Sequence, residues 1–233
     1  MDKQSQQPAP VRELKIERKN LAQHAASRLR DAIIAGDFAP DERLTETSLA
    51  NGLAVSRGTL RTALASLETE GFVVCKNYRS WQIAPLGRQE IWESYTFRAT
   101  LESMAARLVA QRVNDSVREE LTRLLEDMTQ AKTSENRLEC DLALHTTIVR
   151  QAGHSHLSQI YEQALNRFKW IYALSENIEP ERINLHDWHS PLVTAICAGD
   201  AVQASQIAHD MIMTSMSDDL AASSAPVEQE IST

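Results

Sequence analysis

The sequence has no apolar run that approaches the roughly 18–20 residues of a membrane-spanning helix. Its opening stretch, MDKQSQQPAPVRELK, is polar and lacks the apolar segment of a secretory signal peptide. Its 3 cysteines are unevenly spaced and do not form a disulfide framework. We therefore expect a cytoplasmic protein without a membrane partner.

Glycine is scarce in the second half of the chain. Of the 7 glycines, only Gly87, Gly153 and Gly199 follow residue 85, and no strand-like alternation appears there. Apolar residues recur at helical spacing between short polar or glycine breaks, which predicts helices. Six helices are expected, over residues 88–112, 115–132, 134–152, 155–176, 179–198 and 201–218. This half is therefore predicted to be an antiparallel all-α bundle.

Charge is distributed unevenly along the chain, whose net charge is −8. Residues 1–85 carry 12 Lys+Arg against 10 Asp+Glu, whereas the remainder carries 12 against 22. Such asymmetry indicates two domains with different partners. We predict a flexible arm, an N-terminal domain, a helical domain and a disordered tail, over residues 1–19, 20–85, 86–218 and 219–233.

The stretch from Leu44 to Pro85 has the order helix, turn, helix, hairpin. Thr45 can cap a first helix, and Asn51-Gly52 can end it because both residues tolerate a left-handed backbone. Ser56 can cap a second helix, which Gly71 would stop. The buried face of that helix is predicted from Leu60, Ala63, Leu64 and Leu67. With a first helix near residues 20–35, this order predicts a winged helix-turn-helix of three helices plus a β-hairpin.

Two arginines lie off the buried stripe of the second of these helices. Arg57, Thr59 and Arg61 occupy its first turns, where a recognition helix meets base edges. Arginine can donate two hydrogen bonds to guanine, and threonine can reach a phosphate or a thymine methyl. The loop between Lys76 and Ser80 is cationic and could bind the DNA backbone or enter the minor groove.

Residues 21–85 resemble the N-terminal domain of the GntR superfamily of bacterial transcription regulators. The resemblance rests on RLRDAIIAGDFAPDERLTE (28–46), LAVSRGTLRTALASLETEGF (53–72) and the hairpin that follows. It departs from the family at Pro40-Asp41-Glu42, in a turn, and at Gly58, where Pro or Thr is frequent. The resemblance implies binding to a double-stranded DNA operator. The expected DNA-binding residues are Thr45, Arg57, Gly58, Thr59, Arg61, Asn77, Tyr78 and Arg79.

Three potential metal ligands lie on inward-facing stripes of the predicted bundle. Asp141 and His145 are spaced i, i+4 on one helix, and His189 lies on the apolar stripe of a later helix. Polar side chains that project inward from several helices build ligand and metal sites in bundles. An Asp oxygen with imidazole nitrogens suits zinc or another divalent transition metal. The alternative is a hydrogen-bonded core cluster without a metal.

The second half also resembles the FCD-type effector-binding domain that follows this winged helix in one branch of the superfamily. The carrying motifs are FRATLESMAARLVA (97–110), DLALHTTIVRQAGHSHL (141–157) and HSPLVTAICAGDAVQASQIAHDMI (189–212). In metal-binding domains of this type, one Asp and three His ligate the metal, and Asp141, His145 and His189 match three of them. Met211 stands at the expected fourth position, and His209 lies on another face of that helix. Because a thioether is a poor ligand for such metals, water or effector would complete the site, or no metal binds.

The resemblance further implies a small organic acid as effector. Arg98 could face the effector cavity and bind a carboxylate through two hydrogen bonds, or could simply pair with Glu102 one turn away. Arg150, Arg167 and Tyr172 are further candidates for effector binding.

These features predict a homodimeric transcription regulator whose operator binding responds to a small carboxylate. One alternative is a helical metal-dependent hydrolase that uses Asp141, His145 and His189, but no clear nucleophile or general base accompanies them. The other is a winged helix that serves as a protein-interaction module.

Overall fold

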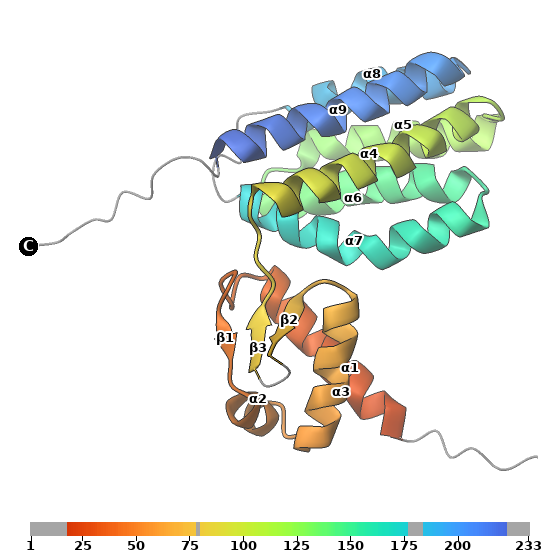
Figure 1. Ribbon diagram of the computed structural model, residues 1–233. Helices are drawn as coiled ribbons and strands as arrows, with labels where there is room; N and C mark the ends of the chain where they lie inside the picture. The colour runs from red at the N-terminus through yellow and green to blue at the C-terminus, as the bar shows by residue number, and fades with distance from the viewer. Residues whose placement is uncertain (1–17, 78–79, 177–183, 223–233) are drawn as a thin grey trace, which may run out of the picture.

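The computed structural model describes residues 18–77, 80–176 and 184–222. In these ranges the chain forms a small winged helix-turn-helix domain, followed by a larger helical bundle (Figure 1). The mainly helical fold class predicted from the sequence is confirmed. Tyr78 and Arg79 of the hairpin loop lie outside the described residues, as does most of the predicted arm and tail.

The N-terminal domain combines three helices with a small antiparallel sheet. Its elements are α1 (Arg18–Ile34), β1 (Arg43–Leu44), α2 (Glu46–Gly52), α3 (Arg57–Thr69), β2 (Val73–Lys76) and β3 (Ser80–Ile83). Strand β3 lies between β1 and β2, so the sheet has the order β1-β3-β2. Strand β1 was not predicted, because two residues are too few to show an alternating pattern. It pairs Arg43 with Gln82 and Leu44 with Trp81.

Local sequence signals explain the ends of helix α3. The Ser56 side chain accepts a hydrogen bond from the Thr59 backbone N–H and thereby caps the helix as predicted. Gly71 follows the helix with a φ of +80°, a left-handed conformation that favours glycine. The prediction for the preceding turn was wrong in its detail. Helix α2 does end at Gly52, but Ala54, with a φ of +53°, is the left-handed residue there.

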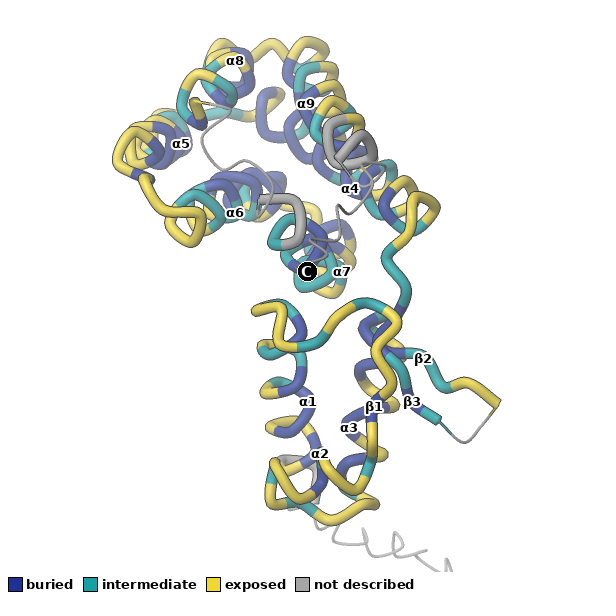
Figure 2. The backbone as a smooth tube through the Cα atoms, turned by 90° about the vertical axis from the view of Figure 1, so that its left-hand side faces the viewer, coloured by how far each residue is buried: buried dark blue, intermediate teal, exposed yellow. Residues whose placement is uncertain are grey.

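The core of the winged domain lies between α1, α3 and the sheet. Leu60, Leu64 and Leu67 are completely buried, so the predicted stripe of α3 does face inward (Figure 2). One member of this core comes from the other half of the chain. Trp170 of α7 is 0% exposed, and its ring centroid lies 5.5 Å from that of Phe72. The two domains therefore share a hydrophobic contact.

The bundle contains six helices in the described residues, as predicted. They are α4 (Arg88–Ala110), α5 (Asp115–Asp127), α6 (Ser134–Gln151), α7 (Ser155–Glu176), α8 (Leu185–Cys197) and α9 (Ala201–Ala222). Helices α4 and α9 pack side by side in antiparallel directions (Figures 1 and 2). Helix α5 gives way to a 3₁₀ turn at Met128–Gln130 instead of reaching residue 132. Helix α8 begins after the capping residue Asn184, and residues 179–183 of its predicted span lie outside the described residues. None of the described helices is long and apolar enough to cross a membrane.

Candidate functional site

The first turn of α3 presents a polar surface built around its N-terminal cap. Ser56 Oγ accepts from the Thr59 backbone N–H at 3.1 Å and lies 2.8 Å from Thr59 Oγ1. The Thr59 hydroxyl therefore belongs to the cap and is half-buried. Gly58 is exposed, and a Cβ atom added there would meet nothing closer than Ser56 Oγ at 3.8 Å. The helix backbone at Gly58 is thus open to close approach by a ligand.

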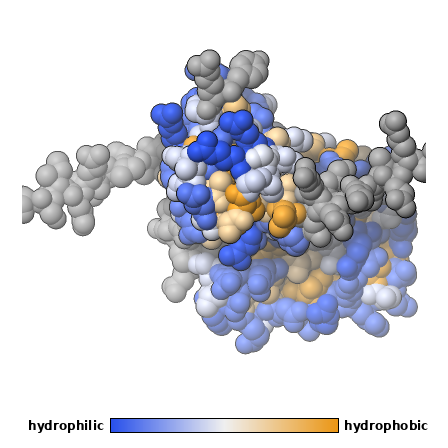
Figure 3. All heavy atoms as spheres, turned by 90° about the horizontal axis from the view of Figure 1, so that it is seen from below, coloured by the Kyte–Doolittle hydropathy of each residue, from blue (hydrophilic) through white to orange (hydrophobic). Residues whose placement is uncertain are grey.

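Both arginines of α3 lie at the protein surface, opposite its buried leucines. The Arg61 side chain is 68% exposed, and its Nε donates to both Glu46 carboxylate oxygens at 3.0 and 3.1 Å. This hydrogen bond and the negative charge of Glu46 raise the pKa of Arg61. Arg57 Nη2 donates to Thr47 Oγ1 at 2.9 Å. Seen from below, this end of the winged domain is mainly hydrophilic, with a small apolar patch (Figure 3).

The remaining residues expected to contact DNA flank this surface. Thr45 is exposed at the N-cap of α2, although its side chain makes no capping hydrogen bond. Asn77 is exposed at the hairpin tip, where its φ of +53° forms the turn. Tyr78 and Arg79 fall outside the described residues, so their place at the hairpin tip stays a prediction.

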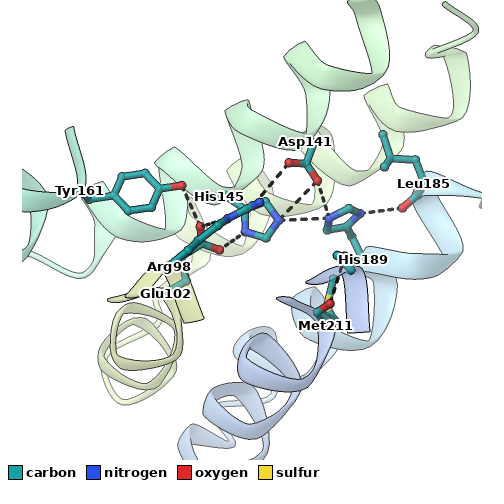
Figure 4. Close-up of polar contacts among 9 residues, drawn as sticks. Arg98, Glu102, Asp141, His145, Tyr161, Leu185, His189 and Met211 are labelled. Carbon is teal, nitrogen blue, oxygen red and sulfur yellow. Dashed lines mark hydrogen bonds and ion pairs between the residues drawn. The ribbon is translucent and has the colours of Figure 1, made fainter. Parts of the chain in front are cut away.

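The predicted metal ligands meet in the interior of the bundle. Asp141 and His145 of α6 and His189 of α8 are all buried, at 5%, 3% and 1% exposure. His189 Nε2 lies 3.1 Å from Asp141 Oδ1 and 3.2 Å from His145 Nε2. The third edge, from His145 Nε2 to Asp141 Oδ1, is 3.6 Å (Figure 4). Ligand atoms around tetrahedral zinc lie about 3.4 Å apart for bonds of roughly 2.1 Å, so this triangle has the size of one face of such a site.

Both imidazoles are oriented so that Nε2 points into this triangle. His189 Nδ1 lies 2.8 Å from the Leu185 carbonyl oxygen and donates to it, which leaves Nε2 as an acceptor. His145 Nδ1 lies 2.5 Å from Glu102 Oε2 in an ion pair. A carbonyl or carboxylate behind the second ring nitrogen is the usual arrangement for a metal-binding histidine. The buried Asp141 Oδ2 has an ion pair with Arg98 Nη2 at 3.5 Å but no hydrogen bond among the described residues, so the carboxylate retains acceptor capacity. The donor set therefore fits a divalent metal.

The fourth corner of the site has no nitrogen or oxygen ligand among the described residues. Met211 of α9 is buried at 8% exposure and lies beside His189 (Figure 4). His209 is exposed and contacts its neighbour Asp210 at 3.1 Å, so it does not replace the missing ligand. Any metal here would take its remaining ligand from water or from a bound acid.

Glu102 and Tyr161 also belong to the cluster, although neither was predicted to. Glu102 Oε1 accepts from Arg98 Nε at 2.7 Å and from the Tyr161 hydroxyl at 2.9 Å. Arg98 Nη2 also lies 3.5 Å from Asp141 Oδ2. Arg98 therefore pairs with Glu102, as one of the two alternatives predicted, and its binding of an effector stays a prediction. One sequence feature could have predicted that Glu102 is buried in this cluster: it lies one turn after Arg98 on the apolar side of the helix.

The pKa values of these buried groups indicate a charge-balanced cluster. Burial opposes ionisation of Glu102, but the charges of Arg98 and His145 lower its pKa to about 2. Burial likewise disfavours the imidazolium of His145, but the Glu102 and Asp141 carboxylates raise its pKa to about 9. The pKa of Asp141 is well below its usual value despite burial, chiefly because of the charge of His145. Without a metal, two cations therefore balance two carboxylates.

The other residues expected to bind the effector lie apart from this cluster. The Arg150 side chain is 64% exposed and pairs with Glu120 at 2.7 Å on the outer face of the bundle, so it lies away from the buried cluster. Arg167 lies at the domain contact, where it donates to the Gly71 carbonyl and covers the Trp170 ring at 4.9 Å. Burial there lowers the pKa of Arg167. Tyr172 is half-buried on the same helix.

Arg98 borders a small hollow between α4 and α7. This hollow is lined by Ser94, Tyr95, Arg98, Phe168 and Ile171. Its walls are mainly apolar and aromatic, with Arg98 as the one cation. Of the four residues predicted to bind the effector, only Arg98 lines this hollow.

Comparison with known proteins identifies both halves of the chain. Residues 21–83 match the family model described as bacterial regulatory proteins, gntR family, and residues 93–214 match that of the FCD domain. The HTH-type transcriptional repressor GlaR of Escherichia coli is 30% identical over 80% of this chain and 90% of its own length. The gluconate operon transcriptional repressor of Bacillus licheniformis is 28% identical over 63% of this chain and 61% of its own length.

Solved structures show the same fold. McbR/YncC of E. coli matches with a TM-score of 0.69 at 20% sequence identity, and the match covers 87% of this chain and 98% of the McbR/YncC chain. A putative GntR transcriptional regulator from Rhodococcus has a TM-score of 0.71 at 20% identity, over 87% of this chain and 99% of its own. The chain therefore belongs to the gntR family of bacterial regulatory proteins with an FCD domain, and it is a DNA-binding transcription regulator, not an enzyme.

Proposed function

We propose that two copies of this protein bind a pseudopalindromic operator and place two α3 helices in neighbouring stretches of major groove. The observation that carries this proposal is the exposure of Arg57 and Arg61 at the beginning of α3, while the opposite face of the helix is buried. Recognition helices meet base edges with their N-terminal residues, and arginine suits guanine. A protein that binds a bacterial operator acts in the cytoplasm, and this is the location that we propose.

An apolar stripe on α4 supports the proposal of a homodimer. It consists of Phe97, Leu101, Met104 and Leu108, at the spacing i, i+4, i+7 and i+11. Phe97 is 43% and Met104 is 48% exposed, although both are large and apolar. Exposed apolar side chains in line along a helix mark a surface that another protein covers. A second copy of the chain would bury the stripe and hold the two winged domains at a fixed spacing.

We further propose that a small carboxylate, as effector, enters the hollow beside Arg98. Arg98 is only 8% exposed, so its charge-assisted hydrogen bonds to a carboxylate would meet less competition from water than those of a surface arginine. Asp141, His145 and His189 would hold a divalent metal such as zinc a short distance away, and the metal would attract the negative charge of the acid. Different affinity for two domain arrangements would then change operator binding.

The DNA-binding proposal is tested with the purified full-length protein and a randomised duplex library. Repeated selection is expected to enrich a site with two related half-sites, one helical turn or a multiple of it apart. Fluorescence anisotropy on the enriched duplex should show affinity that falls steeply with salt, since each neutralised phosphate adds about −0.9 to the log–log slope. No enrichment, or binding insensitive to salt, would contradict the proposal.

Removal of one imidazole should abolish metal binding. His189→Ala takes away one of three protein ligands, and we expect the affinity for Zn²⁺ to fall by roughly 100-fold or more. Isothermal titration of the apo protein with Zn²⁺ measures the change, and one ion per chain is expected for the wild type. His209→Ala is the matched control, because His209 is exposed and outside the cluster. Equal affinities of the two variants would exclude the site.

Glu102 should strengthen metal binding without touching the metal. Its carboxylate contacts His145 Nδ1, and loss of such a contact typically lowers metal affinity by about 10- to 100-fold. Glu102→Gln keeps the shape of the side chain but loses the charge, so we expect a decrease in this range by the same titration. Glu120→Gln is the control on the bundle surface. Unchanged affinity in Glu102→Gln would show that the contact between Glu102 and His145 does not influence metal binding.

A further inference from the structure

Both arginines of the recognition helix are attached to the first turn of α2. Arg61 Nε donates to the two carboxylate oxygens of Glu46, and Arg57 Nη2 donates to Thr47 Oγ1. Glu46 and Thr47 are the first two residues of α2, which packs directly against α3. Each guanidinium thus extends from α3 and is hydrogen-bonded to a side chain of α2.

The contact with Glu46 leaves a particular edge of Arg61 available. Only Nε is engaged by the carboxylate, and neither Nη atom has a partner in the part of the chain that the structure describes. The two Nη groups form the outer end of the guanidinium fork, which can donate two parallel hydrogen bonds to the O6 and N7 atoms of guanine. Glu46 therefore orients Arg61 without occupying the edge that would read a base.

The ion pair between Arg61 and Glu46 contributes little to the stability of the fold. The Arg61 side chain is 68% exposed, and solvent-exposed ion pairs contribute little to stability. Glu46 also carries a negative charge into a surface that would face phosphates, so it opposes non-specific attraction to DNA. Glu46 would therefore improve discrimination between DNA sequences in two ways. Its charge lowers the affinity for DNA of any sequence. Its hydrogen bonds hold Arg61 in one orientation, so this side chain loses less conformational freedom when it binds the correct base.

We propose that Glu46 is a positioning residue for base recognition. It orients Arg61 toward a guanine and lowers the affinity for other DNA, and it acts through Arg61 without touching the base. This inference rests on the proposed DNA-binding function of α3. It assigns to α2 a part in sequence specificity that is separate from its packing against α3.

The test compares Glu46→Ala with Glu42→Ala in the full-length protein. Glu42 lies in the same domain and carries the same charge, but its carboxylate bonds the Ala39 backbone N–H and not the recognition helix. The probe is the duplex enriched by the wild type from a random library, together with versions in which each guanine is replaced in turn. Loss of the guanine read by Arg61 should cost the wild type about 10-fold or more in affinity.

In Glu46→Ala we expect replacement of this guanine to lower the affinity by only about 2- to 3-fold. The affinity of this variant for random duplex should be higher than that of the wild type. Glu42→Ala should keep the full penalty. In an Arg61→Ala background, the change at Glu46 should no longer alter discrimination at that guanine. An unchanged guanine penalty in Glu46→Ala, or the same loss in both single variants, would overturn the inference. Failure of the wild type to enrich any duplex would instead overturn the proposed function itself.

Discussion

Replacement of both α3 arginines, Arg57→Ala with Arg61→Ala, is expected to lower operator affinity by roughly 100-fold or more. Each bidentate arginine–guanine contact contributes about 1–3 kcal/mol of discrimination, and the two side chains lie one turn apart on the same exposed face. Together they would account for most of the difference between operator and random DNA. The double variant should therefore bind the two kinds of duplex with nearly equal affinity.

The fold should survive this double replacement. Both side chains are exposed, and their contacts with Glu46 and Thr47 are surface contacts, which contribute little to stability. Circular dichroism and the melting temperature should thus remain close to those of the wild type, while anisotropy reports the loss of specific binding. A variant that fails to fold would show that the arginines act mainly in the structure.

A matched double variant separates recognition from bulk charge. Arg123→Ala with Arg150→Ala also removes two exposed guanidinium groups, each paired with an acidic residue on the bundle surface. Its net charge equals that of the α3 variant, so any general effect of charge on DNA affinity is the same in both. Preference for the operator should be retained in this control. If the two double variants lose that preference equally, α3 does not read the sequence.

The parts of this fold that follow from local sequence were predictable. In α3, leucines at helical spacing, a serine cap and a terminating glycine act within a few residues of one another, so the pattern specifies the helix without tertiary information. The histidine cluster was predictable for a related reason. Asp141 and His145 share a helix face, and an inward stripe on a second helix supplies His189.

Other features depend on contacts between distant segments. Strand β1 exists only because β3 passes beside it, and its two residues have no strand pattern of their own. Arg150 and Arg98 are both arginines within helices, but only the packing of α4 against α6 and α7 shows that one is buried and the other exposed. Glu102 was assigned to Arg98 by spacing, whereas its contacts with His145 and Tyr161 cross between helices. The spacing of residues within one helix does not predict such contacts between helices.

Trp170 is the clearest case of such long-range dependence, and Trp170→Ala is expected to lower the free energy of unfolding by about 3–5 kcal/mol. The side chain is fully buried among residues of the winged domain, so its removal leaves a cavity between two domains. Urea unfolding followed by circular dichroism measures the loss. Trp92→Ala is the matched control, because Trp92 is 48% exposed and its replacement should change stability by about 0.5 kcal/mol or less.

A second variant shows whether packing or polarity holds the domains together at this contact. The indole Nε1 of Trp170 is buried without a hydrogen-bond partner among the described residues, which costs roughly 1–3 kcal/mol. Trp170→Phe removes that donor and keeps an aromatic ring against Phe72, so the smaller cavity and the lost penalty should largely offset each other. We expect a change of about 1.5 kcal/mol or less.

The destabilisation by Trp170→Ala should also be localised. Because Trp170 belongs to the bundle but packs into the winged domain, its loss should weaken α1 and α3 more than α5, which lies on the far side of the bundle. Hydrogen exchange of backbone amides is expected to accelerate in α1 and α3 of Trp170→Ala and to stay unchanged in α5. Uniform acceleration throughout the chain would instead mean that the two domains unfold as one unit, and that Trp170 contributes to a single shared core.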